Sequence, residues 1–358
     1  MKQKPQLSRR DFLKLSALSV GALVFLPQAK LLAALPEFPQ AEKLGRICAG
    51  EEGARFELKT RPYMDSPRAG WAYRDSVVPW LREVVASRLD RNRINQRWVE
   101  TPQGYLYLPY VQPVKNLPNK PVETFPSYSS EQGMWVEVTV PYVDFTVEAK
   151  PVSPWLGVVN KPRLYYSQVM WVDKIRKDES GQIWYRLREK YGSYGDLFWA
   201  VAEAFRPISP DDIAPIHASA EDKRVVVSLA YQTLTCFEGK EDVYFCRVST
   251  GWGGATPKGV IPSWRKMIST HMSGGSTGAG YDTPGIGWTV LFSSDGAAIH
   301  STFWHNDFGL ARTHGCVNAM PEDALWVFRW TVPSVSYNPG EVTISGMNVS
   351  TRVFINEV

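Results

Sequence analysis

The chain has 358 residues, a hydrophobic content of 44% and a formal net charge of +4 at pH 7. This length and composition predict a multidomain globular protein, because one hydrophobic core rarely organises so many residues. Residues 1–34 hold six of the 40 basic residues and one of the 36 acidic ones, so the remainder has a net charge of −1. That near-neutral remainder excludes an electrostatic nucleic-acid footprint, and four cysteines are too few for a disulfide framework.

The N-terminal segment combines paired arginines with a moderately apolar stretch. Residues 8–14 read SRRDFLK, and the apolar run that follows is too short for an ordinary membrane-spanning helix. This pattern resembles a twin-arginine export signal, with Ala33 and Ala34 as a candidate cleavage point and Ala29 as a second one. The resemblance implies a leader over residues 1–34 and passage through the Tat translocase. It places the protein outside the cytoplasm, at the cell wall or the outer face of the cytoplasmic membrane. An uncleaved membrane anchor is the alternative to a cleaved signal.

Two β-rich regions follow the leader. Within residues 44–115, the segment 98–107 resembles the closing strands of a bacterial SH3-like barrel. A Pro-rich linker over 116–126 leads to a second small β domain over 127–220, which contains the strand-like segment 183–188 and is a candidate for another SH3-like barrel. The 14 Trp and 16 Tyr of the chain favour such β modules. These modules either bind glycan or peptide or only space and orient the next domain, because exposed and packed aromatic residues look alike in sequence.

The last region, residues 222–357, opens with strands. Apolar residues alternate with others over 225–229 and 243–248, which predicts β-strands. Cys236 and Cys246 lie on either side of a predicted hairpin turn. They either form a disulfide after export or remain thiols, since their register is not readable from sequence.

A loop rich in Gly and Ser and a short helix follow in the same region. The loop at 273–280 precedes Tyr281 and a predicted strand at 288–292. A helix is predicted to begin at Pro321, because proline suits the first helical position and acidic residues favour the first turn. It is expected to end before Pro333 and to support the cysteine-containing segment that precedes it. Its apolar face consists of Ala324, Leu325, Val327 and Phe328.

The most reactive side chains lie between this loop and this helix. Residues 313–318 read THGCVN, and His300 precedes them. A cysteine attacks an acyl group as its thiolate, and a nearby imidazole can accept the thiol proton and return one to the leaving amine. Gly315 lets the backbone turn sharply, so that the N–H groups of His314, Gly315 and Cys316 can form an oxyanion hole. The pattern predicts covalent acyl transfer, provided that the fold brings His300 to Cys316.

This order of residues, a histidine and then Thr-His-Gly-Cys, a hydrophobic residue and Asn, resembles the signature of the YkuD-type L,D-transpeptidase catalytic domain. Segments at 225–229, 232–234, 248–251 and 256–259 resemble the strands and the TPxG turn that open the same domain. The resemblance covers residues 222–357. It implies a mainly β fold, with a β-sandwich or barrel as catalytic domain, a short helix after the cysteine, and one or two small SH3-like barrels before it.

The resemblance also implies a role for each residue of the motif. Cys316 would be the nucleophile, His300 its general base, and the backbone carbonyl of Ser301 would orient His300. His314 would line the site. Asn318 would support the loop that presents the thiol.

Two residues depart from the commonest form of the signature. Thr313 stands where Ser is commoner, and Asn318 stands where many relatives have Arg; both variants bear on substrate detail rather than on the chemistry. By the same resemblance, the loop before Tyr281 is a candidate substrate lid, with Tyr281, Trp288 and His305 as its candidate residues. A disordered loop tip is the competing interpretation.

The implied activity is that of an exported cysteine L,D-transpeptidase acting on peptidoglycan stem peptides. Cys316 would form a thioester with a donor stem, and an amine of an acceptor stem would then close a 3→3 crosslink. Water in place of the amine would make an L,D-carboxypeptidase, and an amine on a protein would attach that protein to the wall. No metal or organic cofactor is expected, and carbapenem β-lactams are the expected covalent inhibitors.

Two other classes of function stay open at this point. A noncatalytic wall-binding protein would act through its β modules alone. A zinc hydrolase would use the potential ligands His300, His305, His314 and Cys316. Their spacing matches no common zinc pattern, and no second cysteine pair lies nearby.

Overall fold

The computed structural model describes residues 34–274, 281–345 and 350–357. The predicted twin-arginine motif, the apolar run after it and the candidate cleavage points at Ala29 and Ala33 lie outside the described residues. Most of the predicted lid loop at 273–280 lies outside them as well.

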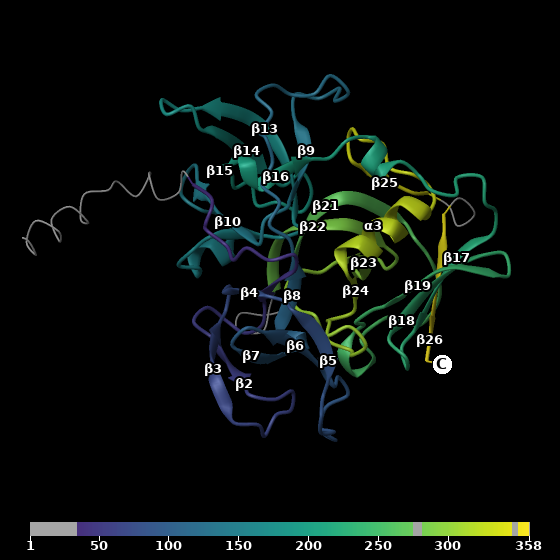
Figure 1. Cartoon of the computed structure of the whole chain (residues 1–358). Coiled ribbons are helices and arrows are strands. Elements are labelled where there is room, and N and C mark those ends of the chain that lie inside the picture. Colours follow the sequence, from purple (N-terminus) through teal and green to yellow (C-terminus); the bar gives the residue numbers. More distant parts are fainter. Residues whose placement is uncertain (1–33, 275–280, 346–349, 358) are drawn as a thin grey trace, which may run out of the picture.

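The first β unit consists of two antiparallel sheets (Figure 1). A three-stranded sheet has the order β4-β1-β8, with β1 at Leu44–Ile47, β4 at Val77–Pro79 and β8 at Val111–Val114. A five-stranded sheet has the order β3-β2-β7-β6-β5. Its strands are β2 (Arg55–Lys59), β3 (Arg68–Tyr73), β5 (Arg82–Val85), β6 (Arg97–Thr101) and β7 (Gly104–Tyr107). The short 3-10 helix η1 (Leu108–Tyr110) joins β7 to β8. The strands predicted over 98–107 are confirmed, whereas the SH3-like barrel stays a prediction.

The second β unit is built on a six-stranded sheet of order β11-β15-β14-β13-β9-β16. Its strands are β9 (Met134–Val138), β11 (Thr146–Val147), β13 (Val169–Lys177), β14 (Ile183–Arg188), β15 (Phe198–Val201) and β16 (Phe205–Pro207). A separate pair joins β10 (Tyr142–Asp144) to β12 (Arg163–Tyr165). Three 3-10 helices connect these strands, η2 (Pro154–Gly157), η3 (Ala202–Ala204) and η4 (Asp211–Ile213). The predicted strand at 183–188 coincides with β14, and the predicted boundaries of both N-terminal domains stay predictions.

Two five-stranded sheets form the last unit. The first has the order β19-β18-β17-β26-β20, from β17 (Lys223–Ser228), β18 (Thr233–Glu238), β19 (Glu241–Arg247), β20 (Gly259–Pro262) and β26 (Arg352–Asn356). The second has the order β24-β23-β22-β21-β25, from β21 (Arg265–Gly274), β22 (Tyr281–Leu291), β23 (Ala298–Ser301), β24 (Val317–Ala319) and β25 (Glu341–Thr343). The 3-10 helix η5 (Trp252–Gly254) precedes β20. The pairs β17–β26 and β23–β24 are parallel.

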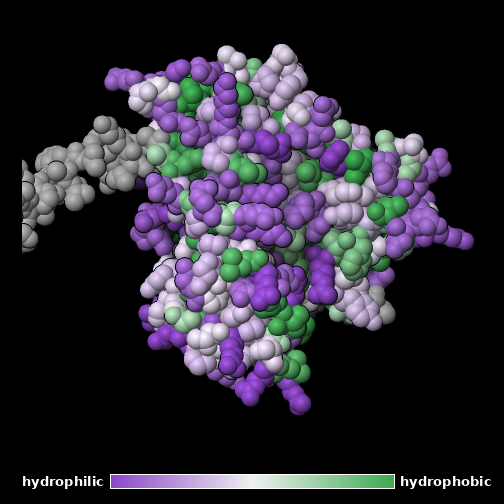
Figure 2. All heavy atoms as spheres, viewed as in Figure 1, coloured by the Kyte–Doolittle hydropathy of each residue, from purple (hydrophilic) through white to green (hydrophobic). Residues whose placement is uncertain are grey.

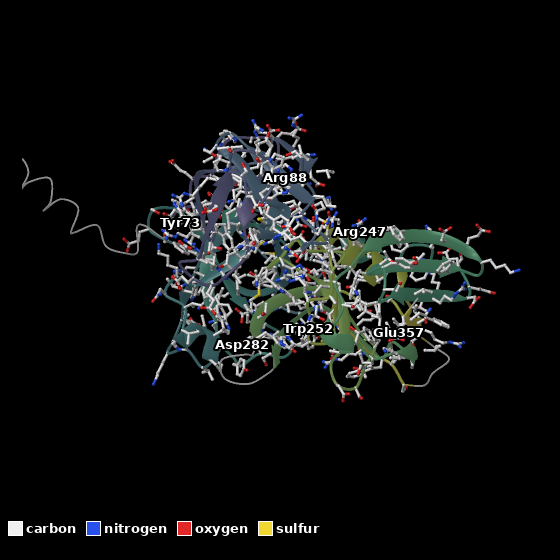
Figure 3. The ribbon with its side chains drawn as sticks, turned by 90° about the horizontal axis from the view of Figure 1, so that it is seen from below. Tyr73, Arg88, Arg247, Trp252, Asp282 and Glu357 are labelled. Atoms are coloured by element: carbon white, nitrogen blue, oxygen red, sulfur yellow. The ribbon has the colours of Figure 1, made fainter. Side chains whose placement is uncertain are left out.

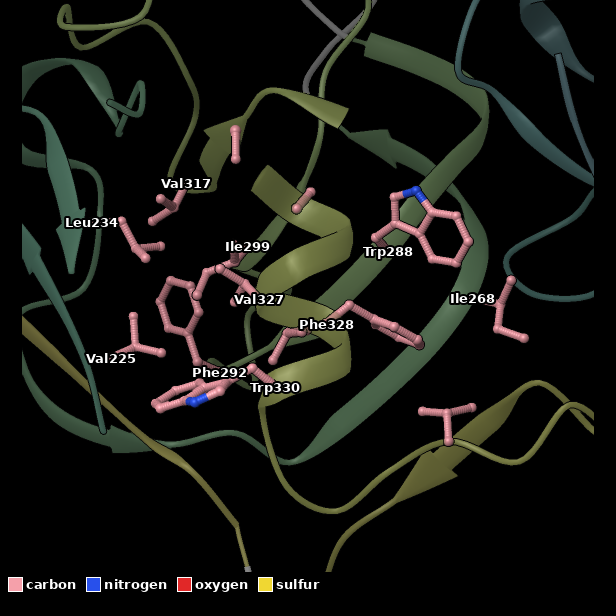
Figure 4. Close-up of a cluster of buried hydrophobic side chains, with 14 of the residues drawn as sticks. Val225, Leu234, Ile268, Trp288, Phe292, Ile299, Val317, Val327, Phe328 and Trp330 are labelled. Carbon is pink, nitrogen blue, oxygen red and sulfur yellow. The ribbon is translucent and has the colours of Figure 1, made fainter. Parts of the chain in front are cut away.

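The helix α3 (Pro321–Trp330) packs into the core that both of these sheets share (Figure 4). Proline occupies its first turn together with Glu322 and Asp323, as the sequence predicted. Its buried side chains are Ala324, Val327, Phe328 and Trp330. They meet Val225 and Leu234 of one sheet and Ile299 and Val317 of the other. Because α3 begins two residues after β24 ends, this packing fixes the strand that follows the cysteine.

The mainly β fold with a short helix after the cysteine is therefore confirmed, and α3 is the one α-helix among the described residues. Seen from below, the sheet that contains β19 and β26, near the labelled Arg247 and Glu357, extends away from the two N-terminal units (Figure 3). On the face drawn in Figure 2, hydrophilic residues predominate and hydrophobic residues are scattered in small groups. Among the described helices, none is long and apolar enough to cross a membrane.

Cys236 and Cys246 are buried free thiols. In the β18–β19 pair, Cys236 lies opposite Tyr244 and Cys246 lies opposite Leu234, so the two cysteines are offset by two residues along the hairpin. Of the two alternatives left open by the sequence, the structure shows unpaired core thiols.

Candidate active site

Strand pairing brings His300 and the cysteine segment together. In the parallel pair β23–β24, His300 lies opposite Asn318. Successive side chains of a strand point to opposite faces, and Ile299 and Val317 point into the core below. His300 and Asn318 therefore share the opposite face. Cys316 lies two residues before Asn318 and packs against a small cluster of Met267, Leu291 and Ala298, the last of which lies two residues before His300.

His300 is held in the form that a general base requires. Its side chain is buried, and Nδ1 lies 2.9 Å from the carbonyl oxygen of Ser301. Because a carbonyl only accepts hydrogen bonds, Nδ1 carries the proton and Nε2 keeps a free lone pair. Burial lowers the pKa of His300 to about 4, against a smaller raising effect of the bond to Ser301. The imidazole is therefore neutral at physiological pH.

The thiol of Cys316 is half-buried and also neutral at rest. Burial raises its pKa, and a hydrogen bond from the Ala298 backbone lowers it in part. Its Sγ lies 3.8 Å from the carbonyl oxygen of Gly296, and the hydrogen bonds of the described residues include none between the thiol and His300. Because both groups are neutral, the site at rest holds no thiolate–imidazolium pair, and the thiol must lose its proton before it can attack.

Thr313 shapes the loop that presents the thiol. Its Oγ1 donates to the carbonyl oxygen of Cys316 at 2.6 Å and accepts from the N–H of Gly315 at 3.1 Å. Gly315 has a φ of 146°, and a Cβ there would lie 3.3 Å from the carbonyl oxygen of Ala255, so glycine is needed. Since Thr313 already engages the Gly315 amide, the amides of His314 and Cys316 are better placed to hold an oxyanion.

Asn318 joins this loop to a buried histidine. Its side-chain amide lies 2.9 Å from Nε2 of His305, and the N–H of Asp307 donates to Nδ1 of the same ring at 3.2 Å. Burial, and then the nearby charge of Arg312, lowers the pKa of His305 to about 3. His305 is therefore a neutral residue of the pocket wall. The expectation that His305 is part of a substrate lid is corrected, because only 7% of it is exposed.

These residues line a cavity of about 440 Å³. Its walls include His300 and the loop of His314, Gly315 and Cys316. Tyr281 forms a further wall by stacking on His314, with ring centroids 5.3 Å apart and planes inclined by 26°. The exposed Trp252 begins a turn next to this loop (Figure 3). Its backbone N–H donates to the carbonyl oxygen of Thr313 at 2.9 Å.

Trp288 is the one predicted lid residue that lies away from the cavity. It is 1% exposed and packs in the core against Phe328, with ring centroids 5.7 Å apart (Figure 4). A residue with a core role cannot cover a substrate, so this expectation is corrected. Its neighbours along β22 from Ile286 to Leu291 are buried too, and the alternation that marks an exposed face is missing there.

One wall of the cavity is not predicted from the sequence. Ala49, Gly50, Pro109 and Tyr110 of the first β unit face the same space as Cys316. Nothing in the sequence near these four residues signals a site, because the contact joins segments that are far apart along the chain.

Comparison with known families identifies the region that carries the site. Residues 222–355 match the YkuD family model, the L,D-transpeptidase catalytic domain. No curated protein sequence matches the chain.

Similar solved structures include L,D-transpeptidases of three bacteria. The Enterococcus faecium protein is 20% identical, with 38% of this chain and 50% of that chain covered and a TM-score of 0.30. The Mycobacterium smegmatis protein is 16% identical, with 60% and 89% covered and a TM-score of 0.31. L,D-transpeptidase 3 of Mycobacterium tuberculosis, solved with a faropenem-derived adduct, is 18% identical, with 48% and 77% covered and a TM-score of 0.30. The chain covers about half the length of the Enterococcus faecium protein.

The thiol, the imidazole and the Thr313 loop all lie inside the matched region. The candidate active site therefore belongs to the part of this chain, residues 222–355, that matches the L,D-transpeptidase catalytic domain of the YkuD family.

Proposed function

We propose that this protein is an exported cysteine L,D-transpeptidase that forms 3→3 crosslinks in peptidoglycan. One observation carries the proposal. In the cavity of the region that matches the YkuD family, Cys316 shares a face with a buried, neutral His300 whose Nδ1 proton is committed to Ser301. That tautomer leaves Nε2 as the acceptor for the thiol proton.

The reaction follows from these positions in two halves. Nε2 of His300 takes the proton of Cys316, and the sulfur attacks the carbonyl between the third, L-centred residue of a donor stem and its terminal D-residue. The backbone amides of the cysteine loop stabilise the oxyanion. The C–N bond then breaks, the departing amine takes the proton from His300, and the stem remains as a thioester on Cys316.

In the second half, an amine of a neighbouring stem gives its proton to His300 and attacks the thioester carbonyl. The C–S bond breaks, the sulfur regains a proton, and the new amide is the crosslink. The same thioester would yield an L,D-carboxypeptidase product with water, or a protein attached to the wall with an amine on that protein. Each step uses side chains or backbone amides of this chain together with groups of the two substrates.

Export rests on the resemblance of residues 8–14 to a twin-arginine signal. The Tat translocase is then the partner during export, and the outer face of the cytoplasmic membrane or the wall is the place of action. A fusion of residues 1–40 to a reporter that is active only outside the cytoplasm tests this part, with the two arginines changed to lysine as the control.

Intact-protein mass spectrometry with a carbapenem tests the catalytic part. A single covalent adduct is expected on the wild-type protein and none on the Cys316→Ala variant, which should remain folded by circular dichroism. A folded wild-type protein without an adduct would count against the proposal. Loss of stem-peptide turnover with a chelator would point to a zinc hydrolase, and an unchanged cellular effect of Cys316→Ala would point to a wall-binding protein.

A further inference from the structure

The segment that links His300 to the cysteine loop is anchored on a different part of the chain. Residues 302–312 run from the end of β23 to Thr313. Within this link, the carbonyl oxygen of Phe303 accepts a hydrogen bond of 2.6 Å from Nη2 of Arg46. Arg46 belongs to β1 of the first β unit, 257 positions earlier, and is 1% exposed. A buried guanidinium from outside the matched region thus holds the link between His300 and the cysteine loop.

Arg46 is itself held firmly. Its Nε and Nη2 donate to Oε1 of Gln112 at 3.1 and 2.7 Å, and its Nη1 pairs with Asp75 at 3.0 Å. The guanidinium carbon lies 4.1 Å from the centroid of the Tyr165 ring, and that ring stacks on Phe303 with centroids 5.7 Å apart. With partners on every side, Arg46 presents its Nη2 to Phe303 in one fixed position.

A second contact between the same two parts lies three residues further along. Nδ2 of Asn306 donates to the carbonyl oxygen of Val111 at 2.8 Å, and the N–H of Asn306 donates to that of Pro109 at 3.3 Å. Pro109 also lines the cavity. The first β unit therefore holds the link at two points and supplies a wall of the site.

Displacement of this link would reach both reacting groups. Trp304, next to Phe303, packs on the ring of His300 with centroids 5.8 Å apart. The next residue of the link, His305, lies within hydrogen-bond distance of the side-chain amide of Asn318, which is two residues after the thiol. A shift at Phe303 would therefore change the position of His300 relative to Cys316, and catalytic rates are sensitive to displacements of about 1 Å.

We propose that Arg46 is a positioning residue of the active site, which sets the separation of His300 and Cys316 by holding the Phe303 carbonyl. The first β unit is then a working part of the transpeptidase rather than a spacer. This inference rests on the proposed function only for the identity of the substrate. The contacts that support it concern the positions of the thiol and the imidazole.

The chain offers a matched control in Arg163. Arg163 also pairs with Asp75, at 3.1 Å, and its guanidinium carbon also lies 4.1 Å from a tyrosine ring, that of Tyr142. It makes no hydrogen bond to residues 302–312 in the part of the chain that the structure describes. Loss of Arg163 weakens the same ionic cluster without releasing Phe303, so the pair Arg46→Lys and Arg163→Lys separates positioning from general stability.

Two measurements on the full chain decide the matter. Amide hydrogen exchange of peptides that cover 302–312 is expected to quicken in Arg46→Lys and in Asn306→Ala but not in Arg163→Lys. The second measurement is the rate of alkylation by iodoacetamide as a function of pH, which reports on the thiol and its base. The alkylation is specific for Cys316, because the other three cysteines are buried. In Arg46→Lys this rate at neutral pH is expected to fall by about 10- to 100-fold, with Arg163→Lys close to the wild type.

Unchanged exchange in Arg46→Lys, or equal effects of both arginine variants, would overturn the inference. If Arg46→Lys does not fold, Asn306→Ala decides the matter independently. Faster hydrogen exchange of residues 302–312 in Asn306→Ala with an unchanged rate of Cys316 alkylation would also contradict the positioning role. Both readouts work without a β-lactam or a stem peptide. A wild-type protein that alkylates in the expected manner but forms no carbapenem adduct would contradict the proposed function and leave the role of Arg46 standing.

Discussion

Tyr281 stacks on His314, the residue two positions before the nucleophile, with ring centroids 5.3 Å apart. Tyr281 lines the same cavity as Cys316, and burial raises the pKa of its hydroxyl. Since α3 and β24 fix the cysteine loop from below, Tyr281 limits it from the open side of the cavity.

Replacement of this ring should slow acylation modestly. A stacked aromatic pair contributes about 0.5–1.5 kcal/mol, so Tyr281→Ala is expected to slow carbapenem adduct formation by up to about tenfold. Tyr281→Phe keeps the ring and should react at nearly the wild-type rate. If both variants were equally slow, the hydroxyl rather than the stacking would be the important feature.

The pH dependence of acylation should reflect the buried state of His300. Burial lowers the pKa of His300 to about 4, so the imidazole remains unprotonated and able to accept a proton down to that pH. The rate of adduct formation is expected to fall only below about pH 4, and a stopped-flow pH profile measures it. His300→Gln should lower the rate by about 100- to 10,000-fold. An acid limb near pH 6.5 would contradict the assignment, since it would indicate a solvated imidazole.

The hydroxyl of Thr313 should matter more than its methyl group. Thr313→Val removes the bonds to Cys316 and Gly315, each with a net contribution of about 1 kcal/mol, so acylation should slow by about 30-fold. Thr313→Ser retains both bonds and serves as the control. Adduct formation by mass spectrometry measures the difference, and a fast Thr313→Val enzyme would show that the loop holds its shape without the hydroxyl.

His271 should make the stability of the fold depend on pH. Its Nδ1 meets both carboxylate oxygens of Glu189, at 2.9 and 3.0 Å, and its Nε2 meets Asp282. Burial alone would lower the pKa of His271, but the bonds and charges of Glu189 and then Asp282 outweigh it and raise the pKa above its usual 6.5. The stabilisation is therefore fully present below pH 6.5 and is lost as pH rises through the higher folded pKa.

The matching experiment compares urea unfolding of His271→Gln and wild type at two pH values. Loss of one partner of a buried ionic cluster costs about 3–5 kcal/mol, and this loss is expected at pH 6 and should be smaller at pH 9. Tyr194→Phe is the control, because Tyr194 packs edge-on against His271 and the hydroxyl that is removed bonds to Ser273 rather than to the ionic cluster. A loss that is equal at both pH values would mean that His271 is neutral in the folded protein.

The sequence predicts the parts of the site that are local in the chain. Thr313 to Asn318 form one continuous motif, and His300 lies one loop away on the neighbouring strand, so pattern alone places them together. The mainly β fold and the helix after the cysteine follow from strand alternation and from proline and acidic residues at a helix start.

Long-range packing decides what the sequence does not predict. Trp288 lies in a strand whose two faces are both buried, so its sequence does not reveal which side meets substrate. The cavity that His305 lines is walled in part by Pro109 and Tyr110, which belong to another unit. The contact of Arg46 with Phe303 spans 257 positions and leaves no periodic signal in either segment.

The position of β26 has a consequence for biosynthesis. This strand lies between β17 and β20, parallel to β17, so β20 has no partner strand and one edge of β17 is unpaired until residues 352–356 are available. Pairing between segments so distant in sequence is slow, because a long loop must close first. The matched region should therefore acquire its native sheet only after these residues have left the ribosome, and a nascent chain that stops before them should expose two unpaired strand edges and be prone to aggregate.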